Sequence, residues 1–119
     1  SNNIGKDPAQ WDVYASAMVT APTGDPEYFF TTCALDNSVS NNGHYHSDKL
    51  EELAAQMENE FDVDKRAELG IQMQQTVLDD NAFVYCSFLK MSQISRANVT
   101  GYTAHACDYY QVTADLDIN

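Results

Sequence analysis

The stretch that decides the fold runs from Gly24 to Lys90 and contains the link Glu60-Phe-Asp-Val-Asp-Lys-Arg66. Apolar residues recur at helical spacing on both sides of this link, and Asp62 or Asp64 begins a new helix after it. The spacing predicts helices over 48–60 and 64–79, which the short link joins into an antiparallel hairpin. The residues expected to face the core are Leu50, Leu53, Ala54, Met57 and Phe61 in the first helix, and Ala67, Gly70, Ile71, Val77 and Leu78 in the second.

Two flanking segments have the character of strands. Ala82-Phe-Val-Tyr-Cys-Ser-Phe-Leu89 is almost wholly apolar, which is typical of a strand covered on both faces. Residues 11–20 and the tail over 109–119 alternate with a period of two, which predicts two further strands, the tail at an edge. Asp25-Pro26 is typical of a helix start, so a short third helix follows it. The predicted fold class is mixed α/β, with the helix hairpin and the short helix packed on a small mixed sheet.

Length and charge limit the function classes. The chain has 119 residues, enough for one small domain over 1–119, and no apolar run long enough to span a membrane. Six basic and eighteen acidic residues give a net charge of −12, which disfavours nucleic acid and anionic membranes as partners. Such a surface keeps a protein soluble, and it also attracts cationic ligands.

Cysteine and histidine give the only metal-like spacings, His44-Tyr-His46 and His105-Ala-Cys107. An His-x-His pair chelates a divalent ion if both rings turn to one side, but both pairs lie in predicted loops, where surface histidines without a ligand are the ordinary alternative. Cys86 is expected to be a small core residue, whereas Cys33 and Cys107 are either free or bridged. The three cysteines form no zinc framework, and no catalytic motif is present, so no enzyme activity is expected.

The order and spacing of the motifs resemble the C-terminal part of the extracytoplasmic solute-binding proteins that serve peptide and nickel ABC importers. The resemblance covers nearly the whole chain, although no single motif in it is diagnostic. The matching residues are Trp11, Gly24-Asp25-Pro26, Asn41-Asn42, Tyr45, Leu50-Glu51, Leu53, Asp62, Arg66, Leu69, Asp80 and Ala82.

The resemblance implies a part of a larger, two-lobed binding protein with a fold like that of type II periplasmic binding proteins. This chain would belong to the C-terminal lobe and supply one wall of the ligand cleft. In such relatives the tail over 109–119 leaves the lobe to complete its neighbour, so here it should fold back irregularly or pair with a second copy of the chain. The implied partners are a small ligand and a membrane permease. The implied location is the periplasm or, for a lipid-anchored protein, the outer face of the cell membrane.

The resemblance also implies ligand-binding residues. In peptide-binding members the Asp of the GDP turn receives the ammonium group of the peptide, which assigns that role to Asp25, with Trp11 and Tyr14 lining the same cleft. The alternative is that Asp25 only caps a helix. Nickel-binding members make nickel or a nickel chelate the other candidate ligand, with His105, His44 and His46 as candidate metal ligands. Two alternatives from other classes stay open, a free-standing acidic interaction module and a metal-dependent enzyme domain built on the histidines.

Overall fold

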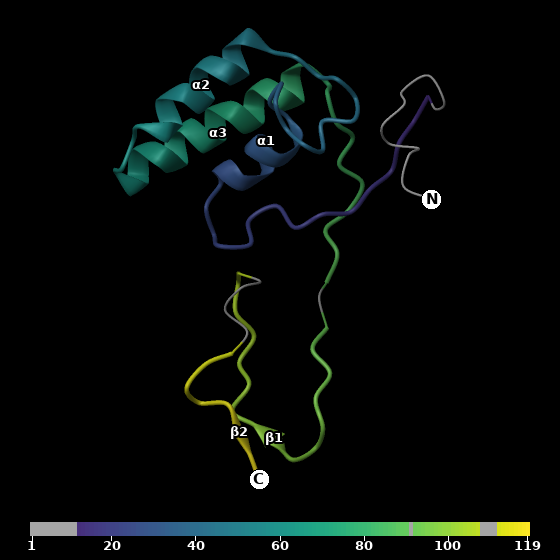
Figure 1. Ribbon diagram of the computed structural model, residues 1–119, viewed down its shortest axis with the longest axis vertical. Coiled ribbons are helices and arrows are strands. Elements are labelled where there is room, and N and C mark those ends of the chain that lie inside the picture. The colour runs from purple at the N-terminus through teal and green to yellow at the C-terminus, as the bar shows by residue number, and fades with distance from the viewer. Residues whose placement is uncertain (1–11, 91, 108–111) are drawn as a thin grey trace.

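The computed structural model describes residues 12–90, 92–107 and 112–119. Figure 1 shows the helices together at one end of the molecule's long axis and the two short strands at the other end. The chain is a small mixed helix-plus-sheet domain, and its sheet has two antiparallel strands. In chain order the elements are α1 (Glu27–Cys33), α2 (Asp48–Glu58), α3 (Val63–Asp79), β1 (Val99–Thr100) and β2 (Asp117–Ile118).

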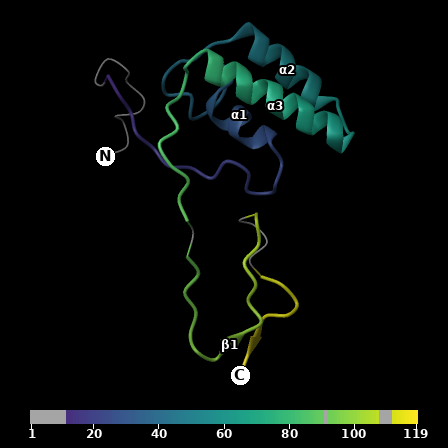
Figure 2. The same cartoon turned by 180° about the vertical axis from the view of Figure 1, so that it is seen from behind.

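The predicted helix hairpin is confirmed, with α2 and α3 packed side by side and α1 against α2. Asp62 marks the start of α3, since its carboxylate accepts hydrogen bonds from the backbone N–H groups of Asp64 and Lys65, each at 3.1 Å. The three helices enclose the hydrophobic core, and Figure 2 shows their arrangement from behind. The core residues are Phe30, Ala34, Leu50, Leu53, Ala54, Met57, Met73 and Val77.

The buried face of α3 differs in part from the predicted one. Gly70 and Val77 are buried as expected, but Ala67, Ile71 and Leu78 are exposed, as is Phe61 in the link. Met73 and Thr76 take the inner positions instead, and the Thr76 hydroxyl donates to the carbonyl of Gln72 at 2.9 Å, so that its burial leaves no unpaired polar group. The contact with α2 and α1 is therefore a narrow stripe, and hydrophobicity alone did not select its members.

The prediction of a covered strand over 82–89 is wrong. These residues belong to none of the described strands, and the expected packing of the helices on a sheet is therefore absent. Phe83 packs partly against the core, but Val84 is 87 % exposed and Phe88 is 97 % exposed. Cys86, expected in the core, is exposed too. The segment thus rests on the core only at its start, at Ala82 and Phe83, and residues 84–90 are exposed.

The strand predicted over 11–20 is also absent from its described part, residues 12–20, which includes exposed Val13 and Val19. A strand forms only when a neighbouring strand supplies backbone partners, and the described residues provide no such neighbour here. The alternating sequence is therefore satisfied by an irregular segment that runs past α1 (Figure 1).

The tail folds back within its own chain. Ile118 pairs with Val99 and Asp117 with Thr100, so strand structure in the described tail is confined to two residues, and residues 109–111 lie outside the described ranges. Gly101 follows β1 with a φ of +76°, and a Cβ there would lie 1.7 Å from the carbonyl oxygen of Asp115. Only glycine fits at this approach. Pairing of the tail with a second copy stays a prediction.

A matched pair of leucine substitutions tests where the core lies. Leu50→Ala should lower the free energy of unfolding by about 2–5 kcal/mol, because Leu50 is fully buried. Leu89→Ala removes the same atoms from a side chain that is 74 % exposed, and it should change stability by about 0.5 kcal/mol or less. Urea unfolding measures both values. Equal losses would contradict the placement of the core within the helices and of residues 82–89 outside it.

Candidate functional site

The turn before α1 presents the carboxylate of Asp25. Gly24 closes this turn with a φ of +89°, and its N–H donates to the carbonyl of Ala21 at 3.0 Å. The Asp25 Oδ1 atom accepts a hydrogen bond from the N–H of Glu27 at 2.9 Å. Asp25 therefore satisfies a free N–H group at the start of α1, as the capping interpretation predicted.

Arg66, in the first turn of α3, binds the same carboxylate. Its Nη2 lies 3.1 and 2.9 Å from the two oxygens of Asp25 and 2.9 Å from Glu27 Oε2. The Glu27 hydrogen bond first, and then Asp25, raise the pKa of the guanidinium above its ordinary value. Three charged side chains from two elements thus form one ion-pair cluster, which is called the Arg66 cluster below.

The other terminal nitrogen of Arg66 binds the end of α2. Nη1 donates to the carbonyl of Met57 at 2.7 Å and to that of Glu60 at 3.1 Å. The Met57 carbonyl lies in the last turn of α2 and also accepts from the N–H groups of Asn59 and Glu60, and Glu60 itself lies in the link after the helix. One guanidinium therefore joins the start of α1, the end of α2 and the first turn of α3.

Gly70 allows α1 to approach α3 beside this cluster. It lies one helical turn after Arg66, and a Cβ at Gly70 would lie 3.1 and 3.2 Å from the Cβ and Cγ atoms of Pro26. Real Cβ atoms rarely pack so tightly, so the missing side chain brings the GDP turn within reach of Arg66. The glycine inside a helix, costly by propensity, thus has a packing reason.

Neither Arg66 nor Glu27 was expected from the sequence to belong to a site. A signal for Arg66 was present, because a cation in the first turn of a helix meets the positive end of the helix dipole and is stable there only with anionic partners. The sequence separation of 41 residues between Arg66 and Asp25 hid which anions those would be.

Of the two aromatic candidates for the cleft, the structure describes Tyr14. Trp11 lies outside the described residues, and Tyr14 lies on the exposed segment 12–20. The Asp25 carboxylate accepts hydrogen bonds from the Glu27 N–H and from the Arg66 guanidinium. Met18, further along the same segment, reaches the helices, with its sulfur 2.8 Å from Cys33 Sγ.

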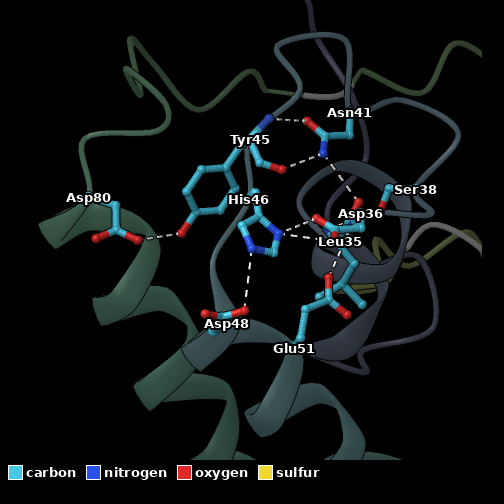
Figure 3. A network of polar contacts seen from close by, with 9 residues as sticks. All are labelled: Leu35, Asp36, Ser38, Asn41, Tyr45, His46, Asp48, Glu51 and Asp80. Carbon is cyan, nitrogen blue, oxygen red and sulfur yellow. Dashed lines mark hydrogen bonds and ion pairs between the residues drawn. The ribbon is translucent and has the colours of Figure 1, made fainter.

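His46 lies between two carboxylates. Its Nδ1 is 2.9 and 3.0 Å from the oxygens of Asp36, and its Nε2 is 3.3 Å from Asp48 Oδ1 (Figure 3). The hydrogen bond to Asp36 is the main cause of a raised pKa of the imidazole, and the charge of Asp48 adds to it. With both ring nitrogens facing carboxylates, the ring in this arrangement presents neither nitrogen to a metal.

The loop that carries His46 is itself held by side chains. The Asn41 amide donates to the carbonyls of Leu35 and Tyr45 and accepts from the Tyr45 N–H, and Glu51 accepts from the N–H of Asp36 (Figure 3). The Tyr45 hydroxyl donates to Asp80 at 2.7 Å and so ties the loop to the end of α3. Glu51, in the first turn of α2, thus holds the loop before that helix.

The remaining metal candidates do not form a cluster. His44 is exposed with a φ of 51°, and the His105 Nδ1 atom accepts a hydrogen bond from the N–H of Cys107 at 3.1 Å. Within residues 12–90, 92–107 and 112–119, no group of three or more His, Cys, Asp or Glu side chains is arranged to hold a metal ion.

All three cysteines are free, so the alternative of a Cys33–Cys107 bridge is not realised. Cys33 is buried beside Met18, and this burial raises the pKa of its thiol. Cys107 lies at the other end of α1, against the turn before it: its Sγ would be 3.0 Å from a Cβ at Gly24. The segment around His105 and Cys107 therefore passes close to the Asp25 turn.

Comparisons with family models, with curated proteins and with solved structures found no significant match. Among the described helices, none combines the length and the apolar character needed to cross a membrane. Among the charged groups of the described residues, the Arg66 cluster is the most connected.

Replacement of Arg66 tests its structural role. Arg66→Gln should lower the free energy of unfolding by about 1–3 kcal/mol, because it removes hydrogen bonds to two carboxylates and to the carbonyls of Met57 and Glu60. Lys65→Gln is the matched control, since Lys65 makes a single exposed ion pair at 3.8 Å, and it should change stability by about 0.5 kcal/mol or less. Denaturant unfolding compares the two, and equal effects would show that Arg66 is an ordinary surface charge.

The pH dependence of His46 follows from its two carboxylates. A raised pKa means that the stability contributed by His46 is fully present below about pH 6.5 and is lost as the pH rises through the raised value. NMR titration of the imidazole should therefore show a pKa above that of a free histidine. Asp36→Asn should lower this pKa more than Asp48→Asn does. The reverse order would contradict the dominance of Asp36.

Proposed function

We propose that this chain is part of the C-terminal lobe of the ligand-binding component of an ABC importer for peptides or nickel. In this role it binds a small ligand without chemical change and delivers it to a membrane permease from outside the cytoplasmic membrane. The proposal rests first on the order of motifs from the GDP turn to Ala82. The observation that carries it further is the apolar surface left uncovered on residues 12–20 and 82–90.

Much of this uncovered surface lies on large apolar side chains that are close together in the sequence. Val84, Tyr85, Phe88 and Leu89 follow one another within six residues, and each is exposed. A soluble domain rarely leaves such a run facing water, so an apolar run of this kind indicates a surface made to be covered. Strand-like sequence without a strand partner points the same way, because the missing partners would supply both backbone hydrogen bonds and cover.

The alternative, a free-standing interaction module, explains less of this exposed apolar surface. Its core would close on itself, and the three helices do so, with Leu50, Met57 and Met73 fully buried. The two strand-like segments, however, touch the helices at Met18, Ala82 and Phe83 but lie largely outside that closed core. In a lobe of a larger protein they would be strands of the sheet on which the helices pack, which is the architecture that the sequence predicts.

Asp25 is the proposed contact for the ligand. Its side chain is 42 % exposed, and among the described residues its Oδ2 atom accepts one hydrogen bond, from Arg66. A carboxylate oxygen has two acceptor positions, so Oδ2 can receive a further donor from the solvent side. A ligand ammonium there would form a charge-assisted hydrogen bond, which closure of a second lobe would shield from water. Such a ligand would bind the closed state more tightly than the open state and so shift the equilibrium toward closure.

Calorimetry on the full-length binding protein tests this role with alanyl-alanine, N-acetyl-alanyl-alanine and Ni²⁺ as probes. If the ligand is a peptide, alanyl-alanine should bind more tightly than its acetylated form, which lacks the ammonium. Asp25→Asn keeps a capping oxygen but removes the charge, and it should weaken alanyl-alanine by about 2–5 kcal/mol.

Glu52→Gln is the control, because Glu52 is an exposed acid on α2 and its loss changes the net charge equally. Affinity for alanyl-alanine that survives Asp25→Asn would reduce Asp25 to a helix cap. Binding of Ni²⁺ alone would identify the ligand class as the metal. Failure of all three probes would contradict the proposed peptide or nickel importer.

A further inference from the structure

The positive and negative charges of the Arg66 cluster do not balance. One guanidinium meets two carboxylates, at 2.9 Å from Asp25 Oδ2 and 2.9 Å from Glu27 Oε2. Asp25 and Arg66 alone would form a neutral pair, in which a ligand cation gains attraction from one partner and repulsion from the other. Glu27 adds the charge that leaves the cluster net negative. A site for a cation needs this excess.

The exposure of the three side chains gives the cluster a direction. The Arg66 side chain is 20 % exposed and that of Glu27 24 %, whereas Asp25 is 42 % exposed. Asp25 is therefore the most accessible of the three charged groups to a cation from solvent, and Arg66 and Glu27 are less accessible.

Arg66 cannot move outward toward a ligand without breaking its hydrogen bonds to the Met57 and Glu60 carbonyls. Its Nη1 is bound to the carbonyls of Met57 and Glu60, and the planar guanidinium fixes the direction of its other nitrogen. Nη2 therefore holds the two Asp25 oxygens from one side, and the Glu27 N–H holds Oδ1 from another. The carboxylate is presented in one orientation before any ligand arrives.

We propose that Arg66 and Glu27 are positioning and specificity-determining residues of this site. Arg66 fixes the Asp25 carboxylate, and Glu27 cancels the charge of Arg66, so that the site selects a ligand with a primary ammonium group. The inference rests on the proposed ligand role of Asp25 and extends it to two residues that do not touch the ligand.

Loss of Glu27 and loss of Arg66 should affect the site differently. Without Glu27 the carboxylate stays oriented, but the pair of Asp25 and Arg66 attracts a cation weakly. Without Arg66 the two carboxylates repel each other, and Asp25 loses its orientation along with the joint between the helices. A change at Glu27 therefore isolates the charge effect, while the fold keeps its Arg66 contacts to α2.

NMR titration of the 119-residue chain tests this with glycinamide as the probe, because glycinamide carries a primary ammonium and no carboxylate. The backbone N–H of residue 27 is the reporter, since it is bonded directly to Asp25 Oδ1. Tetramethylammonium at equal ionic strength is the control, because it carries the charge without an N–H donor. In the unchanged chain the reporter should respond to glycinamide and not to tetramethylammonium.

The variants separate the proposal from its foundation. Glu27→Gln should weaken the glycinamide response about twofold to fivefold, the range for a partly exposed charge, and Glu27→Asp should restore part of it. Glu52→Gln should leave the response unchanged. If Asp25→Asn abolishes the response while Glu27→Gln leaves it intact, the role of Glu27 is overturned and that of Asp25 stands. If the response survives Asp25→Asn, or is absent from the unchanged chain, both are overturned.

Discussion

The ion pair of Arg66 with Asp25 and Glu27 is the interaction on which the arrangement of the helices depends. Hydrophobic burial holds α2 against α3, but it is not directional and does not fix where the polar turn before α1 must lie. Arg66 does so, because its two nitrogens reach carboxylates on one side and carbonyls of the last turn of α2 and of the link on the other. Gly70, one turn further along, leaves room for Pro26 to come this close. The same contacts that complete the fold also hold the Asp25 carboxylate at the surface.

The helices were predictable from the sequence because their causes are local. A cap at Asp62, apolar spacing along α2 and the short link are all readable within a few residues, and the structure bears them out. The strands were not, because a strand needs a neighbour. Residues 82–89 have the composition of a buried strand, yet the described chain contains no partner beside them, and Phe88 remains in solvent. The predicted burial of Ile71 and Leu78 was wrong for a related reason, since the hydrophobicity of a residue does not determine which side of its helix the neighbouring elements occupy.

The candidate site divides in the same way. The cap at Asp25 is local and was foreseen, whereas its ion pair spans 41 residues and was not. His46 was a candidate because of its spacing from His44, but its nitrogens face Asp36 and Asp48, which hold the loop before α2 (Figure 3). Spacing describes which residues are near in sequence. The partners of a charged group are decided by folding, and at both Asp25 and His46 they are charges of opposite sign.

A double-mutant cycle between Asp25→Asn and Arg66→Gln, followed by urea unfolding of the chain, tests the central claim most directly. If Arg66 joins the helices through Asp25, the two substitutions remove one shared interaction, and their effects on the free energy of unfolding should fall short of additivity by about 0.5–3 kcal/mol. Effects that add to within about 0.3–0.5 kcal/mol would show that the two side chains act independently, and would contradict the account.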